Sequence, residues 1–256
     1  MRRAEAGRSR AAEPVGARAA VKDALERTLA ERIGRLLTPL TAIEVAARDP
    51  QSGAALRALA LRLVEAGGVL PRGAAPDALA PPQREQLRGL GVRIGALDLY
   101  HPALLRAAPL ALWMALARVW GIAPPVCPET FAPVLKVTGA LAGYRALGGE
   151  SLRVDLAEKL LRAAHAKRVT APRRRFALDP ALAVSMGLST AGYARLLRLA
   201  GFEVRAPRPV EPDRYGPPGP PLWQWHPPRP RQPAPPPAAP RPTSGAFAAL
   251  SVWAAE

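Results

Sequence analysis

The stretch from Phe176 to Val204 constrains the fold of this chain more than any other, because it has the pattern helix, tight turn, helix, strand. Asp179 is placed to cap the first helix, and Ser189 or Thr190 to cap the second, since short oxygen-bearing side chains accept hydrogen bonds from free N–H groups at helix starts. Gly187 stands between the two helices, where a left-handed backbone ends the first one. This spacing predicts a helix-turn-helix.

A further helix is predicted immediately upstream, from Ser151 to Lys167, with Asp155 near its start as the helix dipole favours. Together with the strand that begins near residue 202, the three helices predict a winged-helix-like domain over residues 123–205, with its helix-turn-helix at 176–201. The alternative is a spacer of the same fold that packs against neighbouring domains without touching nucleic acid.

Residues 20–122 are predicted to form a separate helical domain. A first helix runs from Val21 and repeats apolar residues on one face. The residues on this face are Leu25, Leu29, Ile33 and Leu36 or Leu37. The segment from Ala103 to Trp120 is apolar nearly all round, which predicts the buried centre of the domain, with Trp113 and Trp120 in the core.

The two ends of the chain lack such patterns. Residues 1–19 predict a flexible basic arm. Sixteen of the chain's 31 prolines fall between residues 206 and 242, so residues 206–243 predict a disordered Pro/Arg-rich linker. Residues 244–256 predict a short terminal helix. The predicted fold class is therefore mainly α: a helical bundle, a winged-helix-like unit and a disordered tail.

A strong basic excess indicates the class of partner. The chain has 36 Lys and Arg against 20 Asp and Glu, a net charge of +16, and only four of the basic residues are Lys. Arginine guanidinium groups fit phosphates well, and neutralising phosphates releases counterions, so a nucleic acid is the expected partner. The alternative is the coding bias of a GC-rich genome, which favours Arg, Ala and Pro without any ligand.

Five arginines are the candidates for phosphate contacts. Arg173, Arg174 and Arg175 form a basic run in the loop before the helix-turn-helix, and Arg195 and Arg198 lie on the outer side of its second helix. The alternative for the run is a solvated loop, which is the usual place of an exposed charge cluster.

Two tryptophans inside the predicted linker are weaker candidates. Trp223 and Trp225 stand beside Arg229 and Arg231, and aromatic rings interleaved with arginines can stack on unpaired bases. The favoured alternative is that the two rings pin the linker onto the folded body.

The motifs of common catalytic and cofactor sites are missing. None of the four Lys follows a Gly, which excludes the phosphate loop of Walker-type nucleotide sites. Cys127 is the only cysteine, and the three histidines are far apart, so no metal site or disulfide is expected. We therefore expect no enzyme activity from this chain alone and no cofactor. The sequence lacks an apolar signal and a membrane-spanning stretch, so a cytoplasmic protein without membrane contact is expected.

From about Val21 to its end, the chain resembles the C-terminal accessory region of bacterial superfamily-two helicases related to the mitochondrial RNA-degradosome helicase, a type common in alphaproteobacteria. The segments that carry the likeness are RLVEAGGVLPR (62–72), LGVRIGALDLYHPALLR (90–106), SLRVDLAEKLLRAA (151–164), FALDPALAVSMGLSTAGYARLLRLAGFEV (176–204) and SGAFAALSVW (244–253).

The resemblance implies a non-catalytic module that flanks an RNA channel, since the ATPase lobes of such helicases precede this region. RNA is then favoured over DNA, and the implied partners are helicase ATPase lobes or a degradosome-type nuclease. Two alternatives remain. One is a DNA-binding regulator that reads a groove with the helix-turn-helix, and the other is a protein-interaction subunit that docks on a helicase.

Overall fold

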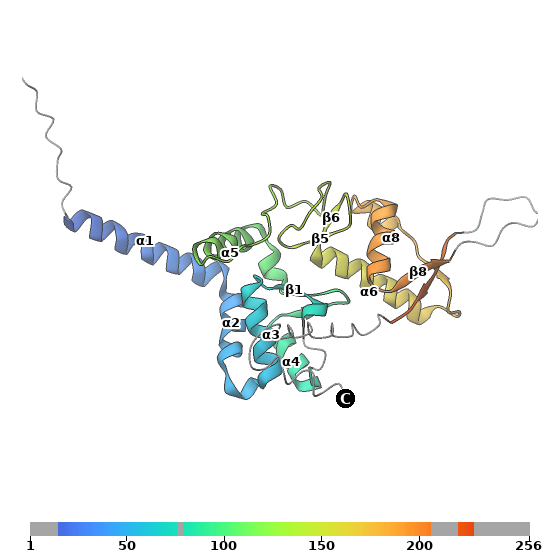
Figure 1. The fold of residues 1–256 in the computed structure, drawn as a ribbon, viewed down its shortest axis with the longest axis horizontal. Helices are drawn as coiled ribbons and strands as arrows, with labels where there is room; N and C mark the ends of the chain where they lie inside the picture. Colours follow the sequence, from blue (N-terminus) through green and yellow to red (C-terminus); the bar gives the residue numbers. More distant parts are fainter. Residues whose placement is uncertain (1–14, 76–78, 206–219, 228–256) are drawn as a thin grey trace, which may run out of the picture. The chain divides into compact units, whose positions relative to one another are not determined.

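The computed structural model describes residues 15–75, 79–205 and 220–227. Helices hold about 55% of these residues, and small antiparallel sheets complete the secondary structure, so the mainly α prediction is confirmed (Figure 1). The described residues up to Trp225 belong to one compact unit, so the boundary predicted between residues 122 and 123 does not separate two compact bodies. The predicted terminal helix at 244–256 lies outside the described residues.

The described residues contain eight α-helices. They are α1 (Val15–Leu36), α2 (Thr38–Arg48), α3 (Ala54–Glu65), α4 (Pro81–Gly89), α5 (Ala107–Val119), α6 (Val154–Thr170), α7 (Ala181–Ser185) and α8 (Thr190–Leu199). Short 3-10 helices are η1 (Pro50–Ser52), η2 (Arg72–Ala74) and η3 (Pro102–Leu105).

The strands form three three-stranded antiparallel sheets, ordered β1-β3-β2, β4-β6-β5 and β7-β9-β8. Their bounds are β1 (Val69–Pro71), β2 (Arg93–Ile94), β3 (Asp98–Tyr100), β4 (Val134–Leu135), β5 (Tyr144–Ala146), β6 (Ser151–Arg153), β7 (Phe176–Ala177), β8 (Phe202–Arg205) and β9 (Leu222–Trp225).

In the first half of the chain, α2 and α3 pack against each other and onto α4 and the first sheet. Their core is built from aliphatic side chains that recur at helical spacing, namely Ile43, Leu56, Leu59, Leu63 and Leu87. These helices lie within the range predicted as a helical domain. The β1-β3-β2 sheet closes the core of these helices. The pairing of its strands was not predicted from the sequence.

Helix α1 corrects the predicted extent of the basic arm. It begins at Val15, so the last residues of the predicted arm 1–19 are helical, because the Ala-rich sequence from residue 15 favours a helix. Its apolar face does not point inward along its whole length. Leu25 is 65% exposed and Leu29 is exposed too, whereas Ile33 packs against the cluster around Leu37.

Helix α5 is buried on one side only. Trp113 lies in the core as predicted, together with Leu110 and Met114. The prediction for Trp120 is wrong, because its side chain is 64% exposed at the residue that caps the C-terminal end of the helix. Apolar composition all round a helix therefore did not mean burial all round it.

In the second half of the chain, α6 packs against α8, and α8 leads directly into β8 of the third sheet (Figure 1). The central strand of that sheet is β9, at residues 222–225. The prediction that residues 206–243 form a disordered linker is therefore wrong at this strand. The physical reason is Trp223, which adds enough buried apolar surface to hold the strand between Phe176 and Val204.

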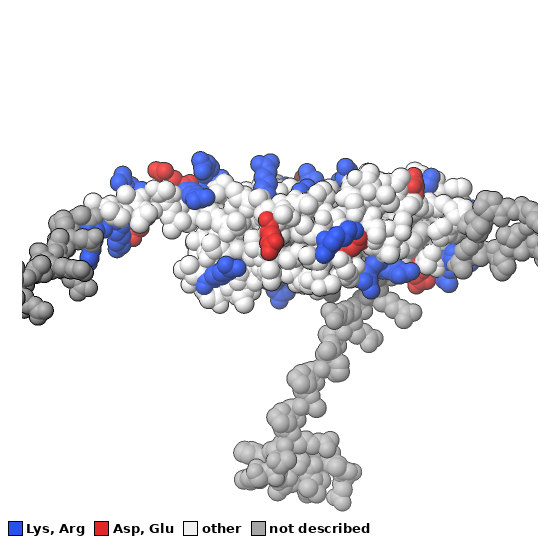
Figure 2. All heavy atoms as spheres, turned by 90° about the horizontal axis from the view of Figure 1, so that it is seen from above, with Lys and Arg blue, Asp and Glu red and all other residues white. Residues whose placement is uncertain are grey.

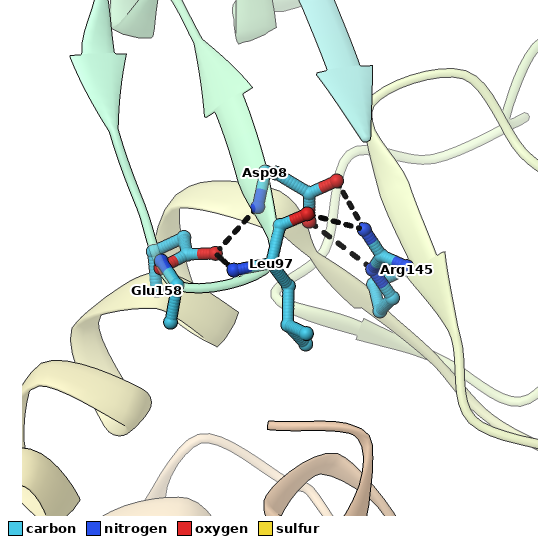
Figure 3. A network of polar contacts seen from close by, with 5 residues as sticks. Leu97, Asp98, Arg145 and Glu158 are labelled. Carbon is cyan, nitrogen blue, oxygen red and sulfur yellow. Dashed lines mark hydrogen bonds and ion pairs between the residues drawn. The ribbon is translucent and has the colours of Figure 1, made fainter. Parts of the chain in front are cut away.

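The two halves are joined by a buried polar network (Figure 3). Glu158 on α6 accepts hydrogen bonds from the backbone N–H groups of Ala96, Leu97 and Asp98 at 2.6, 2.7 and 2.9 Å. The Asp98 carboxylate in turn pairs with the guanidinium of Arg145 on β5. Burial raises the pKa of Asp98, although the Arg145 guanidinium opposes this shift. The network fixes the β2–β3 turn onto α6.

Candidate nucleic-acid interface

The predicted helix-turn-helix residues form the local structure that their chemistry favours. The Asp179 carboxylate accepts from the Ala181 N–H at 2.8 Å at the start of α7, and the Ser189 hydroxyl accepts from the Gly192 N–H at 3.0 Å at the start of α8. Gly187 between them has a φ of 86°, the left-handed region in which a side chain would be strained.

The turn between β5 and β6 covers one side of α8. Glu150 in this turn accepts a hydrogen bond from the Ser189 hydroxyl at 2.7 Å and pairs with Lys136. Burial tends to raise the pKa of Glu150, but the bonds from Lys136 and Ser189 outweigh it and hold that pKa below its ordinary value. The Arg195 guanidinium donates to the carbonyl oxygen of Leu147 at 3.2 Å, in the same turn. This side of α8 is thus engaged within the chain.

The basic run Arg173 to Arg175 is exposed in the loop between α6 and β7. Within the described ranges, none of its three side chains has a hydrogen bond or an ion pair, so the run is free to meet an anion. Figure 2 shows that Lys and Arg side chains are spread along the face in view, with Asp and Glu between them, so no single charged patch dominates that face.

The structure does not place all five predicted phosphate contacts together, because Arg195 is held at a turn away from the basic run. The basic run follows the C-terminal end of α6, whereas Arg195 contacts the turn that leads through β6 into the N-terminal end of the same helix. A helix of 17 residues is about 25 Å long. Arg198 lies one turn further along α8 and is exposed. Arg195 is therefore held toward the opposite end of α6 from the exposed basic run.

Trp223 and Trp225 are occupied by contacts within the fold. Trp223 is 5% exposed in the core of the third sheet. The Trp225 indole N–H donates to the carbonyl oxygen of Ala200 at 3.0 Å, and the guanidinium of Arg168 lies 4.1 Å from the centre of its ring. His165 packs edge-on against the Trp225 ring. Burial lowers the pKa of His165, and the Arg168 charge lowers it further. The two rings pin the strand onto the folded body, as the favoured alternative proposed.

The fold brings four other arginines, which were not among the predicted phosphate contacts, together around one hollow. Arg88, Arg93, Arg106 and Arg162 line one hollow of about 570 Å³, together with His101. They come from α4, from β2, from the residue before α5 and from α6. No sequence motif can show this group, because only the tertiary fold brings these elements together.

The described part of the chain contains no group of three or more His, Cys, Asp or Glu side chains that could hold a metal ion. None of the described helices combines the length and apolarity that a membrane span needs. Comparisons with protein-family models, with curated proteins and with solved structures found no match to this chain. The interpretation of the site therefore rests on its geometry.

Proposed function

We propose that α6 to β9 form a winged helix and that the chain is a non-catalytic nucleic-acid-binding module. The elements follow each other as helix, strand, helix, helix, strand, strand, and the third sheet has the order β7-β9-β8, which is the connectivity of a winged helix. Residues 206–219, between β8 and β9, lie outside the described residues.

The observation that carries the binding proposal is the exposed run Arg173 to Arg175. Three adjacent guanidinium groups without a partner in the described ranges form a site of high positive charge in the loop between α6 and β7. Such groups bind phosphate oxygens through charge-assisted hydrogen bonds. Contacts of this kind depend on the phosphate backbone and not on base identity, so sequence-independent binding follows.

RNA is the proposed ligand because of the resemblance to helicase accessory regions. The alternative of a groove-reading DNA regulator is disfavoured by α8. In that alternative α8 would enter the major groove, but the turn around Glu150 covers the side of α8 that includes Gly192 and Arg195. In the proposed role, strand separation by ATP hydrolysis belongs to lobes carried by another chain, and this module holds the strand.

The proposal is tested by binding of labelled single-stranded RNA, measured by fluorescence anisotropy. Replacing Arg173, Arg174 and Arg175 by Ala should weaken binding about tenfold or more, since it removes three phosphate contacts. A matched control replaces three exposed arginines of α1 and α5 that also lack described partners, Arg32, Arg35 and Arg118. Equal losses in both variants would show that only net charge matters, and the proposed site would be wrong.

A protein-interaction subunit is a second candidate, favoured by apolar exposure at the end of α5. Val119, Trp120, Ile122 and Val126 are all exposed large apolar side chains within eight residues. Clustered exposed apolar groups often mark protein contacts. In this role Trp120→Ser should abolish co-elution with helicase ATPase lobes on size-exclusion chromatography and leave RNA binding unchanged. Unchanged co-elution would eliminate this candidate.

A further inference from the structure

The four arginines of the hollow have an unusual charge environment. Arg88, Arg93, Arg106 and Arg162 all line it, and no acidic side chain among the described residues does so. Within the same ranges, none of the four guanidinium groups takes part in an ion pair or a hydrogen bond. Four cations that share one concave surface repel each other, and a bound anion would relieve this repulsion.

Most acidic groups on the neighbouring elements are paired elsewhere, and Glu85, which stands three residues before Arg88 on α4, is exposed and does not line the hollow. Asp98 on β3 binds Arg145, Asp155 on α6 binds Arg153, and Glu158 accepts from the β2–β3 turn. The fold therefore leaves the four arginines of the hollow without neutralisation, although carboxylates stand on the same strands and helices.

The arrangement of the hollow is fixed by the buried network of Glu158. Its carboxylate holds the β2–β3 turn on α6, and Arg162 lies one helical turn beyond it, so Arg93 on β2 and Arg162 on α6 are held on the same hollow. Two of the four arginines thus stand on a strand and a helix that this network joins.

His101 adds a directed hydrogen-bond donor. Its Nδ1 accepts from the Ala103 N–H at 3.2 Å, which places the proton of the neutral ring on Nε2. Nε2 lies beside Gly91, and both residues line the hollow; a Cβ at Gly91 would come within 2.5 Å of Nε2. Burial lowers the pKa of His101, which favours the neutral form of the ring.

We infer that this hollow is a phosphate-binding site, in which the four guanidinium groups and the His101 Nε2–H hold phosphate oxygens. Arginine forks match the geometry of phosphate, and a hollow of about 570 Å³ has room for more than one phosphate group. The phosphates can belong to a nucleic-acid backbone or to a free phosphorylated small molecule. The inference goes beyond the proposed function, because it concerns other residues than the basic run.

The test is isothermal titration calorimetry of the full chain with pyrophosphate. The unsubstituted protein should bind, and Arg93→Gln and Arg162→Gln should each weaken binding at least about tenfold, as expected for loss of a charge-assisted hydrogen bond. The matched control is Arg118→Gln, an exposed arginine of α5 that does not line the hollow, and it should bind as the unsubstituted protein does. Should either test variant fail to fold by circular dichroism, Arg88→Gln and Arg106→Gln test the same site from other elements.

The source of the phosphate is decided by competition. If pyrophosphate displaces labelled single-stranded RNA and the hollow variants weaken both ligands, the site belongs to the RNA path. If the variants weaken pyrophosphate alone, the ligand is a phosphorylated small molecule. No pyrophosphate binding, or equal binding by Arg93→Gln and Arg162→Gln, would overturn the inference. Substitution of Arg173 to Arg175 tests the proposed function separately, because it should leave pyrophosphate binding unchanged.

Discussion

The buried carboxylate of Glu158 gives a direct test of how the two halves of the chain are held together. Glu158 is 3% exposed, and its carboxylate accepts hydrogen bonds from three backbone N–H groups. A buried donor left without its partner costs about 1 to 3 kcal/mol. The bond from Asp98 is buried and those from Ala96 and Leu97 are half-buried, so Glu158→Ala should lower the free energy of unfolding by about 3 to 5 kcal/mol.

Two further variants separate the hydrogen bonds from the loss of volume. Glu158→Gln keeps the size of the side chain but replaces one acceptor oxygen by an NH2 group that faces the backbone donors, so we expect a loss of about 2 to 4 kcal/mol. Lys159→Ala changes an exposed residue on the same helix and should alter the stability by no more than about 0.5 kcal/mol.

Urea unfolding followed by tryptophan fluorescence measures these differences. Hydrogen exchange adds a local measurement, because the amides of Ala96, Leu97 and Asp98 should lose protection in both Glu158 variants before the rest of the fold does. A loss below about 1 kcal/mol in Glu158→Gln, with these amides still protected, would refute the assigned role of the network.

Other parts of the structure give three further predictions. Ser189→Ala removes the cap of α8 and a bond to Glu150, and should cost about 1 to 2 kcal/mol of stability in urea unfolding, with no loss contradicting the cap. The folded-state pKa of Glu150 lies below its ordinary value of 4.5, so the stability that the Glu150 carboxylate contributes is complete above pH 4.5 and is lost as pH falls through the folded-state pKa. Glu150→Gln should flatten this part of a stability–pH profile, and an unchanged profile would exclude a lowered pKa at Glu150. Trp225→Phe loses the bond to the Ala200 carbonyl and should lower the stability by about 1 kcal/mol, whereas an unchanged midpoint in urea would show that the indole does not hold β9.

The features that sequence predicted well are those governed by near neighbours. The caps at Asp179 and Ser189 and the left-handed Gly187 depend on bonds that span only two to three residues or on one residue's own backbone. Such local chemistry can be identified from the chain alone.

The features that sequence missed depend on distant partners. In the sequence Trp223 stands in a Pro-rich segment, and its strand forms only because Phe176 and Val204 pair with it from distant parts of the chain. Trp120 was predicted to be buried but is exposed, because no local pattern tells which side of an apolar helix packs against a neighbouring element. The four arginines of the hollow lie on four different elements, so the candidate phosphate site arises only in the tertiary structure.

The central claim is that the exposed run Arg173 to Arg175 contacts the phosphates of a single strand. The most direct test is the slope of log K against log salt concentration for single-stranded RNA, measured for the unsubstituted chain and for the variant with three alanines. Each phosphate contact on a single strand contributes about 0.7 to this slope, so the variant should be less steep by about 2. Parallel lines for the two proteins would contradict the claim.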